Sequence, residues 1–223
     1  MLFSLTKKFL FIANLKTAST SIEKVLAPHA DIRLLRSEFD KHLSFAKFIR
    51  HFGWLANRVG MDEVFVFGVI REPVDYVLSL YNGHSKERFR DRPALYTGDM
   101  DFAQFLSVWV PGHPDQLKPQ ISRFKTAEGT IAANLLISFD RLHEGLEIVA
   151  ERLKIPVLTK LPRENESPRR ITRTDLAPDQ IAWIEDRMKT DVEAISHYCD
   201  RLIYSESIQA EATAQSNQRV IGW

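Results

Sequence analysis

Three short apolar runs, each followed by a segment with helical periodicity, constrain the fold of this chain more than any other feature. The runs cover residues 9–13, 64–70 and 134–139, and each falls within the roughly 4 to 8 residues typical of a buried strand. Runs that are apolar throughout, without alternation, are typical of strands covered on both faces. The pattern therefore predicts an α/β fold built from βαβ units around a central parallel sheet.

The helices expected between and after these strands carry apolar residues at three- and four-residue spacing. They are predicted at residues 19–26, 45–59, 74–81, 101–110, 142–153 and 177–202. The last and longest of them is predicted to place one apolar stripe against the protein, made of Ile181, Ile184, Met188, Val192 and Ile195.

Length and charge limit the domain organisation and the partners. With 223 residues, of which 44% are hydrophobic, the chain is predicted to form one domain over residues 1–204. The polar tail at 205–223 is expected to be mobile. The formal net charge is +1, so no overall field favours a nucleic-acid partner, and an anion site must be local.

The sequence also bears on location. The apolar run at 9–13 is shorter than the roughly 7 to 15 residues of a secretory signal core, and no run approaches the roughly 20 residues of a membrane span. The single cysteine, Cys199, forms neither an internal disulfide nor a cysteine metal cluster. We therefore expect a soluble cytoplasmic protein.

A lysine and four hydroxyl residues follow the first predicted strand. Lys16 precedes Thr17, Ser19, Thr20 and Ser21, where a helix is expected to begin. The first N–H groups of a helix lack internal partners and lie at the positive end of its dipole, which suits a phosphate. Alternatively, one of the hydroxyls simply caps the helix. A Walker A loop is excluded, because its lysine follows a glycine-rich turn.

A second anion-suited element follows the second predicted strand. Arg71 ends that strand, Pro73 opens a helix, and Ser79 lies on the helix eight residues after Arg71. Ligands of open α/β sheets bind at the carboxyl ends of the strands. A guanidinium group there can bind a phosphate through two hydrogen bonds. Alternatively, the arginine pairs with a nearby carboxylate. Together, the two elements predict a ligand with two phosphate-like groups.

These segments resemble a known family. The run from Lys16 to Ser21 resembles the 5′-phosphosulfate loop of sulfotransferases that use 3′-phosphoadenosine-5′-phosphosulfate (PAPS), in the carbohydrate-type, heparan 2-O-sulfotransferase-like and bacterial branch. Arg71-Glu72-Pro73 with Ser79-Leu80-Tyr81 is similar to the family's 3′-phosphate motif, and Lys41-His42 lies between the two motifs. Weaker matches occur at 138–142 and 161–167. Leu15 and Ser19 depart from the family pattern, which has proline and glycine there.

The resemblance implies a P-loop-like three-layer α/β/α fold and transfer of a sulfuryl group from PAPS to a hydroxyl, without a metal. It implies that Lys16 stabilises the leaving group and that His42 is the base, with His84 in reserve. It implies nucleotide contacts from Lys16, Thr17, Ala18, Ser19, Thr20, Ser21, Arg71, Ser79, Asn165, Ser167 and Arg169. The acceptor it suggests is a saccharide.

Other interpretations remain open at this stage. Lys86, Arg88, Arg90 and Arg92 either attract an anionic acceptor or form a charged surface loop. The segment with Asn165, Ser167 and Arg169 either closes on the nucleotide or is a solvated linker. The alternatives to a sulfotransferase are a small-molecule kinase and a nucleotide-binding module without turnover, the latter motivated by Leu15 and Ser19. Neither the acceptor nor the oligomeric state follows from the sequence.

Overall fold

A mixed five-stranded sheet forms the centre of the computed structural model, which describes residues 1–35, 41–156, 161–162, 170–200 and 202. The predicted tail at 205–223 lies outside these residues. In sheet order, the strands are β3 (Ile32–Arg33), β1 (Leu2–Ser4), β2 (Phe9–Ile12), β4 (Phe65–Ile70) and β5 (Leu135–Ser138). The parallel trio β2, β4 and β5 confirms the three strands predicted from the apolar runs.

The predicted central parallel sheet is extended at one edge by two antiparallel strands that were not predicted. β1 pairs with β2 and with β3 in antiparallel fashion. A tight turn joins β1 to β2, with Lys8 at φ 49°, and the Asp31 carboxylate holds the turn by accepting the Leu5 N–H at 2.7 Å. Strands of two or three residues are too short to show a periodic pattern, so this edge could not be predicted.

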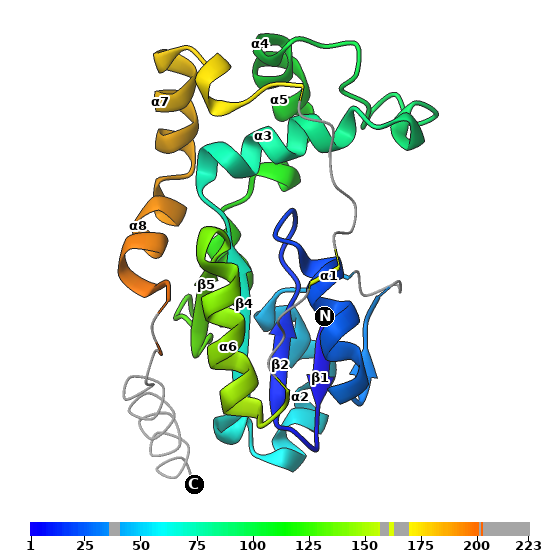
Figure 1. Ribbon diagram of the computed structural model, residues 1–223, viewed down its shortest axis with the longest axis vertical. Coiled ribbons are helices and arrows are strands. Elements are labelled where there is room, and N and C mark those ends of the chain that lie inside the picture. Colours follow the sequence, from blue (N-terminus) through cyan, green and yellow to red (C-terminus); the bar gives the residue numbers. More distant parts are fainter. Residues whose placement is uncertain (36–40, 157–160, 163–169, 201, 203–223) are drawn as a thin grey trace, which may run out of the picture.

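Helices cover both faces of the sheet (Figure 1). Phe9 and Phe11 point into a core cluster with α1 (Ser19–Leu26) and α6 (Leu142–Leu153). The alternate residues of the same strand, Leu10 and Ile12, pack in a second cluster on the other face. That second cluster includes residues of α2 (Phe45–Val59) and α8 (Lys189–Tyr198).

A third cluster lies beyond the carboxyl end of β4, at the top of Figure 1. It is built by α3 (Pro73–His84), α4 (Phe102–Gln104), a π-helical turn (Phe105–Trp109), α5 (Val110–Gly112) and α7 (Pro178–Arg187). Short 3₁₀ helices span Ala27–His29, Met61–Glu63, Glu87–Phe89, Pro114–Leu117, Gln120–Phe124, Phe139–Arg141 and Arg173–Asp175. The carboxyl edge of the sheet and this helical layer face each other.

The helix predicted at 177–202 is two helices, because the chain departs from helical geometry at Met188 (φ −114°, ψ 25°). The two halves serve different cores. Ile184 and Met188 pack in the third cluster, whereas Ile195 packs against the second cluster. Val192 is 42% exposed, so the predicted single stripe is wrong. In the described part of the chain, no helix has the length and apolar character needed to cross a bilayer.

Candidate functional site

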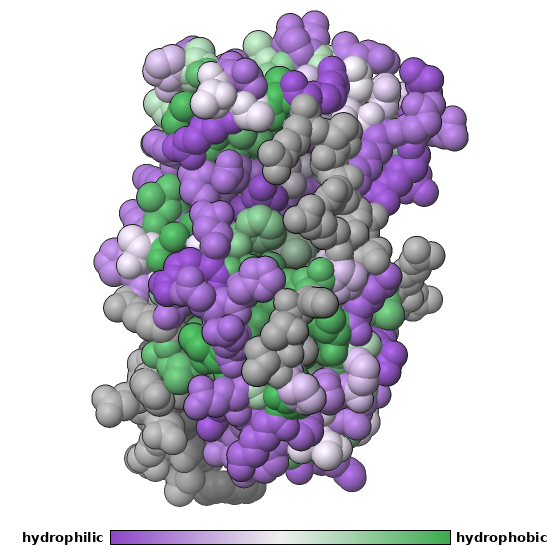
Figure 2. All heavy atoms as spheres, viewed as in Figure 1, coloured by the Kyte–Doolittle hydropathy of each residue, from purple (hydrophilic) through white to green (hydrophobic). Residues whose placement is uncertain are grey.

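Both predicted anion-binding elements line one cavity of about 1020 Å³. It opens where β2 and β4 end, between the sheet and α3. Its wall includes Lys16, Thr17, Ala18, Ser19, Thr20, Ser21, Lys41, His42, Arg71, Asp75, Ser79, Asn82, Arg88, Phe139, His143 and Arg173. In the space-filling view, hydrophobic and hydrophilic residues are interspersed on this face of the molecule (Figure 2).

The turn between β2 and α1 has an unusual backbone. Lys16 and Ala18 have positive φ angles of 59° and 55°, which for residues with a side chain cost roughly 1 to 2 kcal/mol each. Alternation of left-handed and right-handed residues turns successive N–H groups toward one point and forms an anion-binding concavity. The strain falls on Lys16 and Ala18, whereas Ser19 already lies in α1.

The start of α1 is open to a ligand. Its N-cap is Ala18, and among the described residues no side chain caps it. The alternative interpretation, in which a serine or threonine of this turn caps the helix, is therefore wrong. Since the first turn also contains no acidic residue, its N–H groups and the helix dipole are suited to an external anion.

The hydroxyls of this turn are not equivalent. Thr17 is buried, and its hydroxyl donates to the Asn14 carbonyl at 3.1 Å, which stiffens the turn. Thr20 accepts a hydrogen bond from Lys41 Nζ at 2.9 Å. Ser19 and Ser21 are buried at the cavity wall. The sequence predicted nucleotide contacts from all four residues, but the Thr17 hydroxyl hydrogen is engaged within the turn.

Lys16 lies among like charges. Burial, together with Lys86, Arg71 and Arg88, lowers the pKa of its ammonium to about 8. A cluster of cations around a half-buried lysine is unfavourable without a counter-charge, and bound anions remove that cost. The electrostatics of the loop therefore favour a polyanionic ligand.

Arg71 is fixed from both its backbone and its side chain. Its N–H donates to Gln120 Oε1 at 3.0 Å, and its carbonyl accepts from Gln120 Nε2 at 2.7 Å. The guanidinium lies 4.4 Å from the centre of the Phe139 ring. Its Nη1 donates to the Lys16 carbonyl at 3.3 Å, so the second element is in direct contact with the first.

The residues that hold Arg71 were not predicted from the sequence. The carboxylate of Asp191, which is fully buried, accepts the N–H groups of Gln120 and Ile121, each at 2.8 Å. The amide of Asn14, at the end of β2, donates to the Val69 carbonyl at 3.2 Å. This network connects the ends of β2 and β4 to α8 through side chains with no distinctive sequence pattern.

α3 presents one polar face to the cavity. Asp75, Ser79 and Asn82 recur at helical spacing and line the wall, as residues on one face do. Ser79 is thus placed on the same side as Arg71. Burial raises the pKa of the Asp75 carboxyl, an effect that Arg71 opposes. Unlike α1, this helix is capped, since the Glu72 carboxylate accepts the Asp75 N–H at 2.9 Å.

His42 is half-buried at the cavity, and its Nδ1 lies 2.9 Å from the Ala13 carbonyl. A carbonyl only accepts, so Nδ1 carries the hydrogen, and in the neutral ring Nε2 is the acceptor nitrogen. His84 is different. It is buried, its ring stacks on Phe89 with 4.6 Å between centres, and burial lowers its pKa to about 4. These differences favour His42 over His84 as a base.

The predicted basic segment divides into two groups. Arg88 lines the cavity and Lys86 is close enough to influence Lys16. Arg90 pairs with Glu87 at 3.1 Å on the surface, and Arg92 is exposed. The predicted contacts Asn165, Ser167 and Arg169 lie outside the described residues. Arg173, which the sequence did not single out, lines the cavity and pairs with Glu72 at 3.0 Å.

Comparison of the chain with protein-family models, with curated proteins and with solved structures found no match.

Proposed function

We propose that this protein is a PAPS-dependent sulfotransferase that transfers a sulfuryl group to a hydroxyl of a saccharide acceptor and releases adenosine 3′,5′-bisphosphate. The observation that carries the proposal is the meeting of two anion-suited elements in one cavity, with Arg71 Nη1 3.3 Å from the Lys16 carbonyl. We also propose that the sheet and the helices on its two faces form the P-loop-like three-layer arrangement of this family.

The cavity suits a nucleotide with phosphates at both ends. Its volume of about 1020 Å³ is at the upper end of the roughly 300–1,000 Å³ of ligand pockets, which leaves room for an acceptor. In the proposal, the open N-terminus of α1 and the Thr20 hydroxyl hold the 5′-phosphate. Arg71 and Ser79 hold the 3′-phosphate, in keeping with the preference of guanidinium for phosphate oxygens.

The proposed reaction is an in-line displacement at sulfur. The acceptor oxygen forms a bond to sulfur while the bond from sulfur to the bridging oxygen breaks, and that electron pair remains on the 5′-phosphate. Lys16 stabilises the developing negative charge, which is the kind of fixed electrostatic contribution that lowers such barriers most. The acceptor proton passes to His42 Nε2, which is the basic nitrogen of the ring because Nδ1 donates to the Ala13 carbonyl.

Calorimetry combined with label transfer tests the proposal. The protein should bind adenosine 3′,5′-bisphosphate more tightly than ATP with Mg²⁺, and it should release label from ³⁵S-labelled PAPS into at least one member of a panel of saccharides. Preference for ATP would favour the kinase alternative and contradict the proposal. Bisphosphate binding without transfer to any acceptor would favour a binding module.

Substitution of His42 tests the base. His42→Gln should leave the affinity for adenosine 3′,5′-bisphosphate unchanged and lower kcat by about 10² to 10⁴, the usual contribution of general-base catalysis. His197→Gln is a matched control, because His197 is exposed on α8 and its Nδ1 contacts the Glu193 carbonyl. An unaltered kcat in His42→Gln would remove His42 from the base role.

A further inference from the structure

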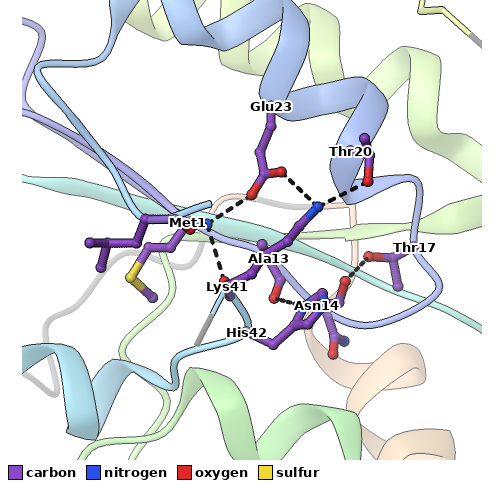
Figure 3. Close-up of polar contacts among 9 residues, drawn as sticks. Met1, Ala13, Asn14, Thr17, Thr20, Glu23, Lys41 and His42 are labelled. Atoms are coloured by element: carbon purple, nitrogen blue, oxygen red, sulfur yellow. Dashed lines mark hydrogen bonds and ion pairs between the residues drawn. The ribbon is translucent and has the colours of Figure 1, made fainter. Parts of the chain in front are cut away.

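A salt bridge beside the phosphate loop connects that loop to the segment that carries His42. Lys41 Nζ lies 2.8 Å from Glu23 Oε2 and 2.9 Å from Thr20 Oγ1 (Figure 3). Thr20 and Glu23 lie in α1, whereas Lys41 lies on the segment that precedes α2. One ammonium group therefore joins the first turn of α1 to the residue next to His42.

Glu23 fixes the position of that ammonium group. Its side chain is 5% exposed, and its other oxygen, Oε1, accepts a hydrogen bond from the amino group of Met1 at 2.8 Å. A buried carboxylate with two cationic partners has a well-defined geometry, because each oxygen is directed at a different donor. The Lys41 side chain, at 21% exposed, is therefore held on α1 even though the cavity is open beside it.

The contact with Lys41 decides how the Thr20 hydroxyl can bond. An ammonium group has donors and no acceptor, so the Thr20 oxygen accepts and its single hydrogen points elsewhere. Thr20 lines the cavity, which makes that hydrogen available to a bound anion. The Thr17 hydroxyl differs, since it donates to the Asn14 carbonyl within the turn.

The backbone next to Lys41 is held at the same time. His42 Nδ1 donates to the Ala13 carbonyl at the end of β2, at 2.9 Å, and the His42 carbonyl accepts from Arg123 Nη1. The histidine ring is thus connected to the loop on one side through Ala13 and on the other through Lys41. Lys41 and His42 are neighbours in the chain, so both contacts act on one short segment.

We propose that Lys41 is a positioning residue that orients the Thr20 hydroxyl toward an anion bound at the start of α1 and couples the presence of that anion to the position of His42. The base role of His42 rests on the proposed function. The orientation of Thr20 and the coupling to the histidine ring do not, since they require only an anion in the loop.

The affinity for inorganic pyrophosphate tests the first half of the proposal. It has no adenosine and no 3′-phosphate, so it reports on the loop alone. Lys41→Met and Thr20→Val should each weaken pyrophosphate binding about tenfold, as expected for loss of one hydrogen bond to a charged group. The double variant should be no weaker than the weaker single variant, because both remove the same interaction. Lys47→Met, an exposed residue of α2, should bind as the wild type does.

Several outcomes would overturn this half. Unchanged affinity in Lys41→Met means that the lysine does not orient Thr20, and losses that multiply in the double variant mean that Lys41 touches the anion itself. Absence of pyrophosphate binding by the wild type also contradicts it. If Lys41→Met does not fold, Thr20→Val carries the test, because the ion pair of Lys41 with Glu23 stays intact in that variant.

NMR of the histidine rings tests the second half. The Hε1 resonance of His42, assigned by its absence in His42→Gln, should shift when pyrophosphate saturates the wild type. The shift should disappear in Lys41→Met at saturation and return in part in Lys41→Arg, which restores a cationic donor. A full shift in Lys41→Met would overturn the coupling. Transfer from PAPS, measured separately, tells a failure of the proposed function from a failure of this inference.

Discussion

The two strand-to-helix junctions at the cavity are built in different ways. Between β2 and α1, the chain has two positive φ angles, at Lys16 and Ala18, and within the described residues no side chain caps the helix. Between β4 and α3, the turn is short, Pro73 opens the helix, and the Glu72 carboxylate already caps it.

The difference indicates how each junction can hold an anion. At the start of α1, the backbone N–H groups are the donors, so the side chains are secondary. At the start of α3, the helix end is occupied by Glu72, and the donors must come from Arg71 and the polar face of the helix. A single side-chain substitution should therefore do more damage to binding at the second junction than at the first.

The largest effect is expected at Lys16, the one residue of the first junction proposed to act on the leaving group. Lys16→Met should lower kcat by about 10²-fold or more, because it removes a positive charge from the developing anion. The affinity for adenosine 3′,5′-bisphosphate should fall less than kcat does, since the backbone donors remain. Steady-state kinetics and calorimetry separate the two. Equal losses in both would show that Lys16 serves binding alone.

Arg71 provides the direct contrast between the junctions. Arg71→Ala should weaken adenosine 3′,5′-bisphosphate by about 10- to 100-fold, as loss of charge-assisted hydrogen bonds predicts. Adenosine 5′-phosphosulfate, which has no 3′-phosphate, should be almost unaffected. Arg58→Ala, at an exposed position of α2, is the matched control. Loss of both ligands to the same extent would indicate damage to the cavity and not to one subsite.

The features that were predicted from the sequence are local ones. The strands at β2, β4 and β5 are apolar throughout, and Lys16 and Arg71 follow them directly, so one rule about parallel sheets brings both residues to one edge. The positive φ angle at Ala18 and the cap at Glu72 were not predicted, because the same residues adopt other conformations in other turns.

The features that were missed depend on distant partners. Asp191 lies in a polar stretch of α8 and is fully buried, and its burial is compensated by the N–H of Gln120, 71 positions away, which donates to its carboxylate. Met188 ends α7 where the chain passes from one core cluster to another. The orientation of Thr20 likewise depends on Lys41. Single-sequence patterns carry no information on such pairs, since each partner alone resembles an ordinary surface residue.

The pH dependence of binding follows from Lys16. The pKa of its ammonium is lowered to about 8, and a bound anion raises it again, so binding takes up a proton above about pH 8. The affinity for adenosine 3′,5′-bisphosphate should fall about twofold between pH 7 and 8 and about fivefold from pH 8 to 9, in proportion to the protonated fraction of Lys16. Calorimetry in two buffers of different ionisation enthalpy measures the proton uptake. Lys16→Met should show neither the decline nor the uptake; a decline that persists there would assign it to another group.

The smallest effects test the strain and the cap, and they have opposite signs. Ala18→Gly should raise the free energy of unfolding by a few tenths of a kcal/mol to about 1 kcal/mol. It removes the cost of φ 55°, but the glycine gains entropy in the unfolded chain and offsets part of that benefit.

Glu72→Ala should lower the free energy of unfolding by about 1 kcal/mol, because the Asp75 N–H loses its acceptor. Urea denaturation measures both. If Ala18→Gly is also destabilising, the first junction is not strained, and its left-handed residues are held at no cost by the surrounding contacts. The contrast between an open, strained helix start and a closed, relaxed one would then reduce to the presence or absence of a cap.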